Sequence, residues 1–253
     1  MAIDLWKKEM MDNIFIKNNY KKVFEIKNEY APRKLYRYRT GTIQKKVFKK
    51  KCFDIENLKN NKMWASAVSQ FNDPFDCRLM IDLMDLVPKY LKDSERLQKK
   101  AHKGNYELNK RIGDEIYVIC FSEKCDSIPM WSYYANNHKG FCIEYERADL
   151  KKAYPVVYTN ESIKVEDANL LSYNTYIKSE QWEHEKEWRI VRPDKPNKNK
   201  GILIDSCKPT AIYVGCRASD ELKMMLSGYC IENNVKIYQM NMNPKEYKLE
   251  IKG

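Results

Sequence analysis

The hydrophobic pattern of the chain begins as a helical one and then changes to short apolar segments. Apolar residues recur every three or four positions through residues 1–30, which predicts one or two amphipathic helices that end at Ala31-Pro32. A continuous apolar run at Ile116–Phe121 is typical of a buried strand. Shorter apolar runs follow at residues 141–145, 156–158, 202–204, 211–215 and 235–238, with a helix expected at 220–233. This order predicts an α+β fold with a mostly antiparallel sheet core and flanking helices.

A single domain is the expected organisation, with N-terminal helices over residues 1–30 and the α+β core over residues 31–253. The 253 residues suffice for one large hydrophobic core, and no internal repeat or low-complexity segment interrupts the pattern. Residues 79–111 read as helical and become highly charged. Within them, a Lys- and Asn-rich span at residues 99–110 predicts a surface loop between two helices.

Two arginines stand on an alternating segment near the start of the core. If residues 34–40 form a strand, Tyr36 and Tyr38 share one face while Arg37 and Arg39 share the other. On an exposed edge strand these arginines would serve solubility. Alternatively, their planar guanidinium groups could bind a phosphate or a carboxylate, or pair with acidic residues elsewhere in the chain.

Three acids alternate with other residues further along the chain, at Glu183, Glu185 and Glu187. The β-branched residues after them favour a strand that begins near Lys186, with a helical or loop approach before it. In an extended segment the three acids would share a face with Arg189. Carboxylates this close repel each other, which raises the pKa of one of them. A solvated face of acids paired with arginines is the alternative interpretation.

The composition is globular and carries an excess of positive charge. Hydrophobic residues make up 43% and charged residues 32%, which excludes a disordered chain. No apolar run approaches the roughly 20 residues of a membrane helix, and the N-terminus lacks the apolar core of a secretory signal, so we expect a cytoplasmic protein. The 46 basic against 35 acidic residues give a net charge of +11, which would attract nucleic acid, a phosphate-bearing cofactor or an acidic partner. A proteome rich in Lys and Asn would give a similar excess, so charge alone does not choose among these. Eight scattered cysteines without a C-x-x-C pair predict reduced thiols and no structural zinc site.

Five ordered motifs resemble a family of unknown function. The motifs together resemble the bacterial domain-of-unknown-function family 2971, and they are L-Y-R-Y-R (35–39), F-N-D-P-F-D (71–76), C-F-S (120–122), M-W-S-Y-Y-A-N-N-H-K-G-F-C-I-E-Y (130–145) and W-E-H-E-K-E-W-R-I (182–190). The resemblance spans the chain from Leu35 to about Gly215. Asn72-Asp73-Pro74 in the second motif marks a turn whose polar side chains hold their own backbone or position a ligand hydroxyl. This family resemblance implies no particular chemistry.

A second resemblance does imply a chemistry. An arginine on an early strand, a serine at the end of a middle strand and an E-x-E at a late strand are similar to the arginine–serine–glutamate signature of ADP-ribosyltransferases that use NAD. The resemblance gives the arginine role to Arg37 or Arg39, the serine role to Ser122, and the E-x-E to Glu185 and Glu187. The segment C-F-S-E lacks the serine–threonine–serine run of that signature. The resemblance implies an ADP-ribosyltransferase-like fold with NAD as the ligand.

The residue types suit the reaction that this resemblance implies. Cleavage of the nicotinamide–ribose bond develops an oxocarbenium-like cation, which the carboxylate of Glu187 would stabilise. Glu185 would orient or deprotonate the incoming nucleophile, and an arginine fork would hold the pyrophosphate. The remaining candidate ligand contacts are Trp131, Tyr134, Trp182, Asn72 and Asp73. Trp131 also fits core packing, because it lies on an apolar stripe.

Three functions follow as hypotheses. The first is an NAD-dependent ADP-ribosyltransferase that acts on nucleic acid or protein, as a toxin or a phage-defence effector. The second is a metal-dependent nuclease or phosphodiesterase in which clustered acids and a lysine hold magnesium, with the candidates Asp73, Asp76, Glu185, Glu187 and Lys186. The third is a non-catalytic nucleotide- or partner-sensing module whose arginine–glutamate face is a structural ion-pair network.

Overall fold

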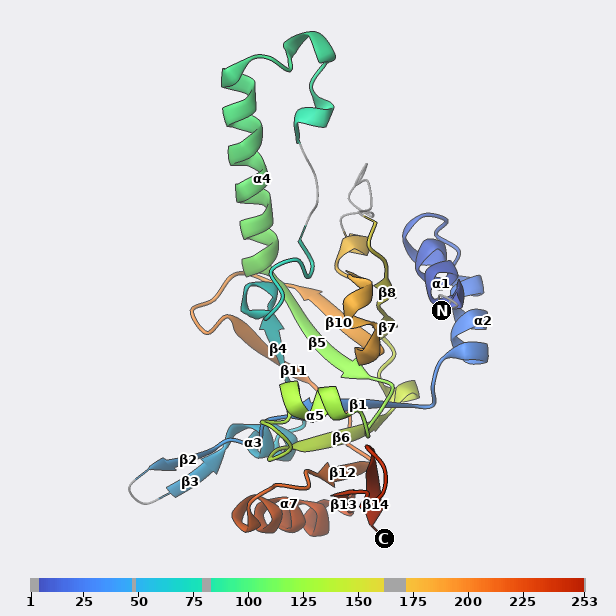
Figure 1. Cartoon of the computed structure of the whole chain (residues 1–253), viewed down its shortest axis with the longest axis vertical. Coiled ribbons are helices and arrows are strands. Elements are labelled where there is room, and N and C mark those ends of the chain that lie inside the picture. Colours follow the sequence, from blue (N-terminus) through green and yellow to red (C-terminus); the bar gives the residue numbers. More distant parts are fainter. Residues whose placement is uncertain (1–4, 47–48, 79–82, 162–171, 253) are drawn as a thin grey trace.

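The computed structural model describes residues 5–46, 49–78, 83–161 and 172–252 and has the mixed α+β organisation that the sequence predicts (Figure 1). The N-terminal pattern forms two helices, α1 (Leu5–Phe15) and α2 (Tyr20–Tyr30). The second helix begins after Asn19, whose side chain accepts a hydrogen bond from the backbone nitrogen of Lys22 and so caps the helix. Both helices lie on the same side of the molecule, beside the short strands of residues 154–158 (Figure 1).

A ten-stranded sheet forms the centre of the described chain. Its strands are β1 (Lys34–Arg39), β4 (Lys62–Ala67), β5 (Ile116–Ser122), β6 (Phe141–Glu146), β7 (Tyr154–Pro155), β10 (Glu187–Pro193), β11 (Gly201–Asp205), β12 (Ala211–Val214), β13 (Lys236–Met242) and β14 (Leu249–Lys252). The order is β11-β4-β5-β1-β6-β12-β13-β14. In addition, β10 pairs with β5, and β7 pairs with β10. The described strand pairs of this sheet are antiparallel except for β12 with β13, so the predicted sheet type is confirmed.

The other elements surround this sheet. Two short strand pairs lie outside it: the antiparallel pair β2 (Ile43–Lys46) and β3 (Lys49–Cys52), and the parallel pair β8 (Val157–Tyr158) and β9 (Ile177–Lys178). The other helices whose bounds lie within the described residues are α3 (Phe53–Lys59), α4 (Glu95–Glu115), α5 (Ile128–Tyr134) and α7 (Asp220–Asn233). Short 3-10 helices are η1 (Val68–Gln70), η2 (Leu83–Leu86), η3 (Lys89–Leu91), η4 (Arg147–Asp149) and η5 (Glu180–Glu185).

The sheet forks along one edge of β5. On its first edge β5 pairs with β10 over its whole length. On its second edge it pairs with β4 at Tyr117 and Val118, and with β1 at Ser122. In the described chain, β4 and β1 therefore separate alongside residues 119–121, and a gap in the sheet opens between them.

Strand β1 lies inside the sheet, between β5 and β6. Its alternation is the predicted one, since Leu35 is wholly buried in the main core while Tyr38 packs in a second cluster with Trp131. Arg37 is only 8% exposed. The interpretation of this segment as a solvated edge strand is therefore wrong, because β1 pairs with both β5 and β6 and Arg37 is buried.

Helix α4 replaces the surface loop that was expected at residues 99–110. It is a continuous helix of 21 residues that stands away from the sheet (Figure 1). Long charged side chains are good helix formers, and pairs four residues apart each add roughly 0.2–0.5 kcal/mol, so the high charge of this span favours helix over loop. Three such pairs occur here: Lys99 with Glu95 at 3.7 Å, Lys103 with Glu107 at 3.8 Å and Arg111 with Glu115 at 3.2 Å.

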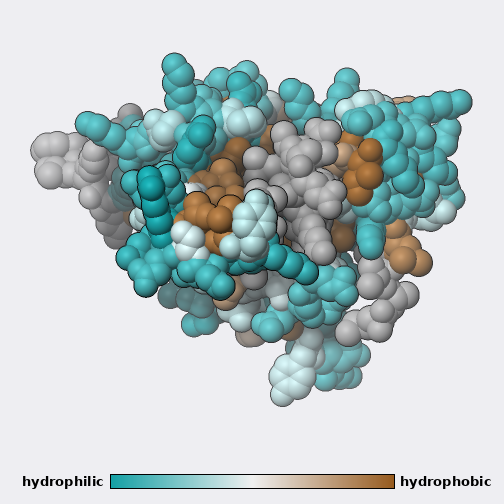
Figure 2. Space-filling model, turned by 90° about the horizontal axis from the view of Figure 1, so that it is seen from above, coloured by the Kyte–Doolittle hydropathy of each residue, from teal (hydrophilic) through white to brown (hydrophobic). Residues whose placement is uncertain are grey.

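The surface agrees with the high content of charged residues. Seen from above, hydrophilic side chains cover most of this face, and hydrophobic atoms show only in separate patches between them (Figure 2). No helix in the described part of the chain combines the length and the apolar character that a membrane span needs.

Candidate active site

Glu185 and Glu187 flank a left-handed turn, and both side chains line the same cavity. The 3-10 helix η5 ends at Glu185, Lys186 adopts φ 45° and ψ 55°, and β10 begins at Glu187. A non-glycine residue in this conformation costs roughly 1–2 kcal/mol, so its surroundings must hold it. The nitrogen of Lys186 donates to Glu183 O at 3.1 Å, and its carbonyl accepts from Glu123 N at 3.1 Å. The predicted start of the strand is confirmed, but the extended alternation begins only at Glu187.

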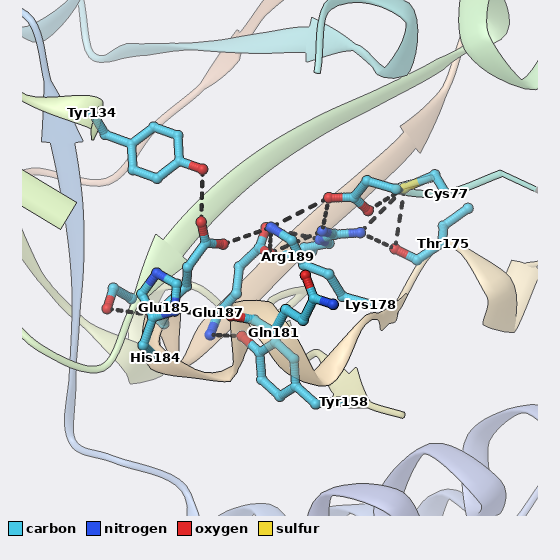
Figure 3. Close-up of polar contacts among 12 residues, drawn as sticks. Cys77, Tyr134, Tyr158, Thr175, Lys178, Gln181, His184, Glu185, Glu187 and Arg189 are labelled. Carbon is cyan, nitrogen blue, oxygen red and sulfur yellow. Dashed lines mark hydrogen bonds and ion pairs between the residues drawn. The ribbon is translucent and has the colours of Figure 1, made fainter. Parts of the chain in front are cut away.

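The ammonium of Lys178 lies among three buried carboxylates. Its Nζ atom is 2.6 Å from Glu185 Oε2, 3.1 Å from Glu187 Oε2 and 3.3 Å from Asp76 Oδ2. Figure 3 shows Lys178 and the two glutamates pointing toward one another. Because all four side chains are buried, the positive charge offsets a repulsion between the acids that water would screen only weakly.

Arg189 binds two of the same carboxylates. Its Nε and Nη2 atoms donate to Glu187 at 2.8 and 2.9 Å, and Nη2 also donates to Asp76 Oδ2 at 2.7 Å. Its Nη1 donates to Thr175 O at 2.8 Å and lies 3.2 Å from Cys77 Sγ. Arg189 is 0% exposed, so this bidentate pair fixes the carboxylate of Glu187 inside the protein. The interpretation of the acids as a solvated face is therefore wrong for Glu187.

The two glutamates have opposite pKa shifts. Burial raises the pKa of Glu185 above its usual range; Lys178 opposes this shift and the neighbouring Glu187 adds to it. Burial also opposes the charged form of Glu187, but Arg189 and Lys178 outweigh it and lower the pKa of Glu187 to about 2. The pKa of Lys178 is raised although burial opposes the charged form, because Glu187 and Asp76 stabilise the ammonium. Glu187 therefore stays ionised, while Glu185 is the carboxyl group better suited to exchange a proton, as the acid crowding predicts.

Hydrogen bonds with Tyr134, Ser122 and Tyr158 fix the positions of Glu185 and Glu187. The Tyr134 hydroxyl, on α5, donates to Glu185 Oε1 at 2.7 Å (Figure 3). Ser122 Oγ donates to the backbone carbonyl of Glu185 at 2.7 Å, and the backbone nitrogen of Glu187 donates to Tyr158 OH at 2.7 Å. The turn between the two acids is thus fixed by side chains from β5 and β8, which limits its freedom to move.

A cavity of about 310 Å³ opens at the fork of the sheet, next to this cluster. Its size is within the range of small-molecule pockets, roughly 300–1,000 Å³. Aromatic rings and thioether or amide side chains form much of the wall. The cavity brings together most of the predicted site residues, which come from distant parts of the chain: Arg37, Arg39, Asn72, Ser122, Tyr134, Glu185 and Glu187.

The two predicted arginines have different partners. Arg39 donates from Nε to Asp54 Oδ1 at 2.7 Å, so its charge is already paired. Arg37 donates from Nη2 to the carbonyl of Trp64, which joins β1 to β4 across the fork. Within the described chain no ion pair connects Arg37 to a carboxylate. Burial, with a contribution from Arg39, lowers the pKa of Arg37 to about 10, so it remains charged at neutral pH. Arg37 is therefore the arginine available to bind an anion in the cavity.

Three predicted ligand contacts do not line this cavity. Trp131 is fully buried, and its indole nitrogen donates to a backbone carbonyl at 2.7 Å, so it is a core residue. The ring of Trp182 lies under the ammonium of Lys178, with 5.1 Å between Nζ and the ring centre. Asp73 accepts a hydrogen bond from the backbone nitrogen of Phe75 at 2.9 Å and so stabilises its own turn. The three side chains therefore have packing, ring or turn contacts outside the cavity wall, because an aromatic ring or an acid near a motif can also serve packing or a turn.

The other members of the cluster differ in how far the sequence indicates them. Lys178 is one of 46 basic residues, and it reaches the acids only because β9 pairs with β8, where Lys178 lies opposite Tyr158. Asp76 ends the F-N-D-P-F-D motif, which by itself indicates a metal ligand at most. For Arg189, its place two residues after Glu187 on a strand was a usable signal, since alternation puts both side chains on one face.

The clustered acids face cations of the protein itself. Among the described residues there is no group of three or more His, Cys, Asp or Glu side chains arranged to hold a metal ion. Asp76, Glu185 and Glu187 converge on Lys178 instead. The lysine considered for a nuclease, Lys186, pairs with Glu183 at 3.1 Å, outside this cluster. The described residues therefore offer no particular ligand set for the metal-dependent hypothesis.

Comparison with known proteins gives one match. Residues 130–166 match a family model described as a protein of unknown function (DUF2971). The described part of this segment contains α5 with Tyr134 and continues through β6, β7 and β8. The match supports the resemblance to that family over a shorter span than the five motifs suggest. No curated protein and no solved structure matches the chain.

Proposed function

We propose that the cavity at the fork of the sheet binds NAD and that Glu185 and Glu187 transfer its ADP-ribosyl group to an acceptor. The observation that supports this proposal most strongly is the placement around one cavity of a guanidinium that has no carboxylate partner among the described residues and of two carboxyl groups of unequal pKa. We choose NAD as the ligand because of the arginine–serine–glutamate resemblance. The residues that correspond to this signature, 37, 122, 185 and 187, all line this cavity.

The wall of the cavity suits the parts of a dinucleotide. Arg37 would bind the pyrophosphate, since a planar guanidinium offers paired donors to phosphate oxygens and this one has no acidic partner in the described chain. Phe71 and Tyr134 present aromatic surface for a nicotinamide ring. Asn72 offers an amide to a ribose hydroxyl or to the carboxamide.

The two carboxyl groups divide the chemistry. As the bond between the ribose carbon and nicotinamide breaks, its electron pair leaves with nicotinamide and positive charge develops on the ribose. Glu187, ionised and held by Arg189, stabilises that charge electrostatically. The acceptor forms a bond to the ribose carbon and gives its proton to Glu185, which Tyr134 orients at 2.7 Å.

A structural role for the same network leads to a different expectation. Buried ion pairs are costly to break, so a network that serves stability alone would respond to Glu187→Gln with a lower melting temperature and with no change in any activity. The raised pKa of Glu185 and its place on the cavity wall favour a catalytic role over this alternative. The proposed role as a toxin or phage-defence effector stays a prediction, and cell growth on expression of wild type against Glu187→Gln tests it.

Release of nicotinamide from NAD is the test of this function. We expect the purified protein to release nicotinamide, and Glu187→Gln to reduce the rate about 100-fold or more, as for loss of a group that stabilises transition-state charge. Glu183→Gln is the matched control, because Glu183 pairs with Lys186 and lies outside the cavity. An inactive wild type over a range of acceptors, or equal rates for wild type and Glu187→Gln, would contradict the proposal.

A further inference from the structure

A second groove shares a wall with the cavity. Phe71, Asn72 and Asp76 line both the cavity and a groove of about 700 Å³ that lies between α4 and residues 68–78. The shared segment is short, and Phe71 packs over the buried guanidinium of Arg189 with 5.7 Å between the group and the ring centre. A molecule held in the groove therefore lies next to the proposed reaction centre, with one turn of chain between them.

The groove combines aromatic surface with positive charge. Phe71 and the exposed ring of Tyr106 offer planar faces, and Arg78, His102 and Lys110 offer cations or hydrogen-bond donors. The acids Asp73, Asp76 and Asp114 also line it, but Asp73 is engaged by the backbone of its own turn, and Asp76 is paired with Lys178 and Arg189. Rings interleaved with basic side chains are the features that bind unpaired nucleobases and their phosphates.

Basic side chains extend this chemistry along α4. Arg96, Lys99, Lys103 and Lys110 recur at spacings of three, four and seven residues, which places them along one side of the helix. With a rise of about 1.5 Å per residue, this row is about 21 Å long, which matches about six nucleotides of a stacked strand at roughly 3.4 Å each. The pairs of Lys99 with Glu95 and of Lys103 with Glu107 are highly exposed, and such pairs are weak, so both lysines can exchange them for phosphates.

We infer that the groove between α4 and residues 68–78 binds a single-stranded nucleic acid, which is the acceptor of the ADP-ribosyl group. This inference rests on the proposed function. In a duplex the bases are stacked and paired. An unpaired base can instead stack on Tyr106 and extend past residues 71–76, the segment that lines both the groove and the cavity, toward Glu185. In the transfer, a base nitrogen bonds to the ribose carbon and loses a proton to Glu185, while nicotinamide leaves with the electron pair of the broken bond.

The experiment measures binding and transfer separately. Binding of a fluorescently labelled single-stranded oligonucleotide, of the same sequence as a duplex, and nicotinamide release are each followed for wild type and two groove variants, Tyr106→Ala and Lys110→Ala. We expect the single strand to bind more tightly than the duplex. Tyr106→Ala should weaken binding of the single strand about tenfold or more. Lys110→Ala should reduce the slope of the logarithm of the binding constant against the logarithm of the salt concentration by about 1. Both variants should release nicotinamide from NAD alone at the wild-type rate.

Matched controls are available on the same chain. Tyr247 is fully exposed and does not line the groove, and Arg111 is an exposed cation on α4 that does not line it either, so Tyr247→Ala and Arg111→Ala should bind as wild type. All four changes are at exposed positions, and circular dichroism checks that the variants are folded. Label transfer from NAD to the oligonucleotide completes the test.

The outcomes separate this inference from the proposed function. If nicotinamide release is absent but the single strand binds and Tyr106→Ala weakens it, the proposed reaction fails and the groove stands as a nucleic-acid site. The inference is overturned if nicotinamide is released but the single strand binds no more tightly than the duplex. It is also overturned if Tyr106→Ala binds the single strand as tightly as wild type. Transfer of label to proteins of a lysate and to no nucleic acid would overturn it as well.

Discussion

Arg37 and Glu187 lie one strand apart at the fork of the sheet. Ser122, at the end of β5, pairs with Tyr36 on one edge and with Glu187 on the other, and Arg37 follows Tyr36 directly. The register of three strands thus brings a cation and a carboxylate from distant parts of the chain to the wall of one cavity. The other charged groups of the cluster hold the carboxylate side of this arrangement in place.

The first prediction concerns Lys178. In Lys178→Met the three carboxylates lose their common cation, and we expect a loss of about 3–5 kcal/mol in the free energy of unfolding, as for other broken buried pairs. Urea denaturation measures this. The control is Lys223→Met, which removes an exposed partner of Asp220 and should cost less than about 1 kcal/mol. Similar losses for the two variants would show that Lys178 does not neutralise the cluster.

The second prediction separates the two arginines of β1. Arg37→Lys keeps the charge but removes the planar fork, so we expect KM for NAD to rise about tenfold with little change in melting temperature. Arg39→Gln breaks the pair with Asp54 and should lower the melting temperature more than it affects KM. Steady-state kinetics and thermal denaturation of both variants check this. The reverse pattern, with KM sensitive to Arg39 and not to Arg37, would contradict the assignment of the anion site.

Some of this arrangement could be predicted from the sequence. Alternation placed Arg37 and Arg39 on one face of a strand, and the β-branched residues after Lys186 located the start of β10. The crowding of Glu185 and Glu187 indicated that one pKa would rise. These are local properties, because each depends on residues within one strand or turn.

The rest depends on long-range pairing. Lys178 joins the acids through a two-residue strand whose partner, at Tyr158, lies far earlier in the chain, and no periodicity marks such a contact. The burial of Trp131 and the turn at Asp73 were ambiguous for another reason: the same residue types serve packing, capping and binding. The Lys- and Asn-rich composition of residues 99–110 predicts a loop, although pairs of opposite charge four residues apart favour the helix that forms.

The third prediction uses the hydrogen bond of Tyr134. The donation to Glu185 lowers the pKa of this carboxyl, against the larger effect of burial, so Tyr134→Phe should raise it further. If Glu185 acts as the base, the acidic limb of the kcat/KM profile moves to higher pH in the variant. Tyr133→Phe, on the neighbouring exposed ring, is the control and should leave the limb in place. A profile that does not move in Tyr134→Phe would exclude Glu185 as the titrating base.

The fourth prediction concerns stability at low pH. The pKa of Glu187 is lowered to about 2 in the folded state, against about 4.3 in an unfolded chain, so its contribution is present above pH 4.3 and is lost as the pH falls toward 2. The raised pKa of Glu185 acts in the opposite direction, because this residue binds its proton more tightly in the folded protein. Glu185→Gln removes that second effect. We expect the acid-induced loss of stability to be steeper in Glu185→Gln than in Glu185→Gln with Glu187→Gln, measured by urea denaturation across this pH range.

The most direct test of the central claim is a crystal structure of Glu187→Gln with NAD bound, since this change should slow the reaction and preserve the ligand. We predict that the pyrophosphate lies within hydrogen-bond distance of the Arg37 guanidinium and that the nicotinamide ribose lies beside residue 187 in the cavity at the fork. NAD bound elsewhere, or with its pyrophosphate away from Arg37, would contradict the account.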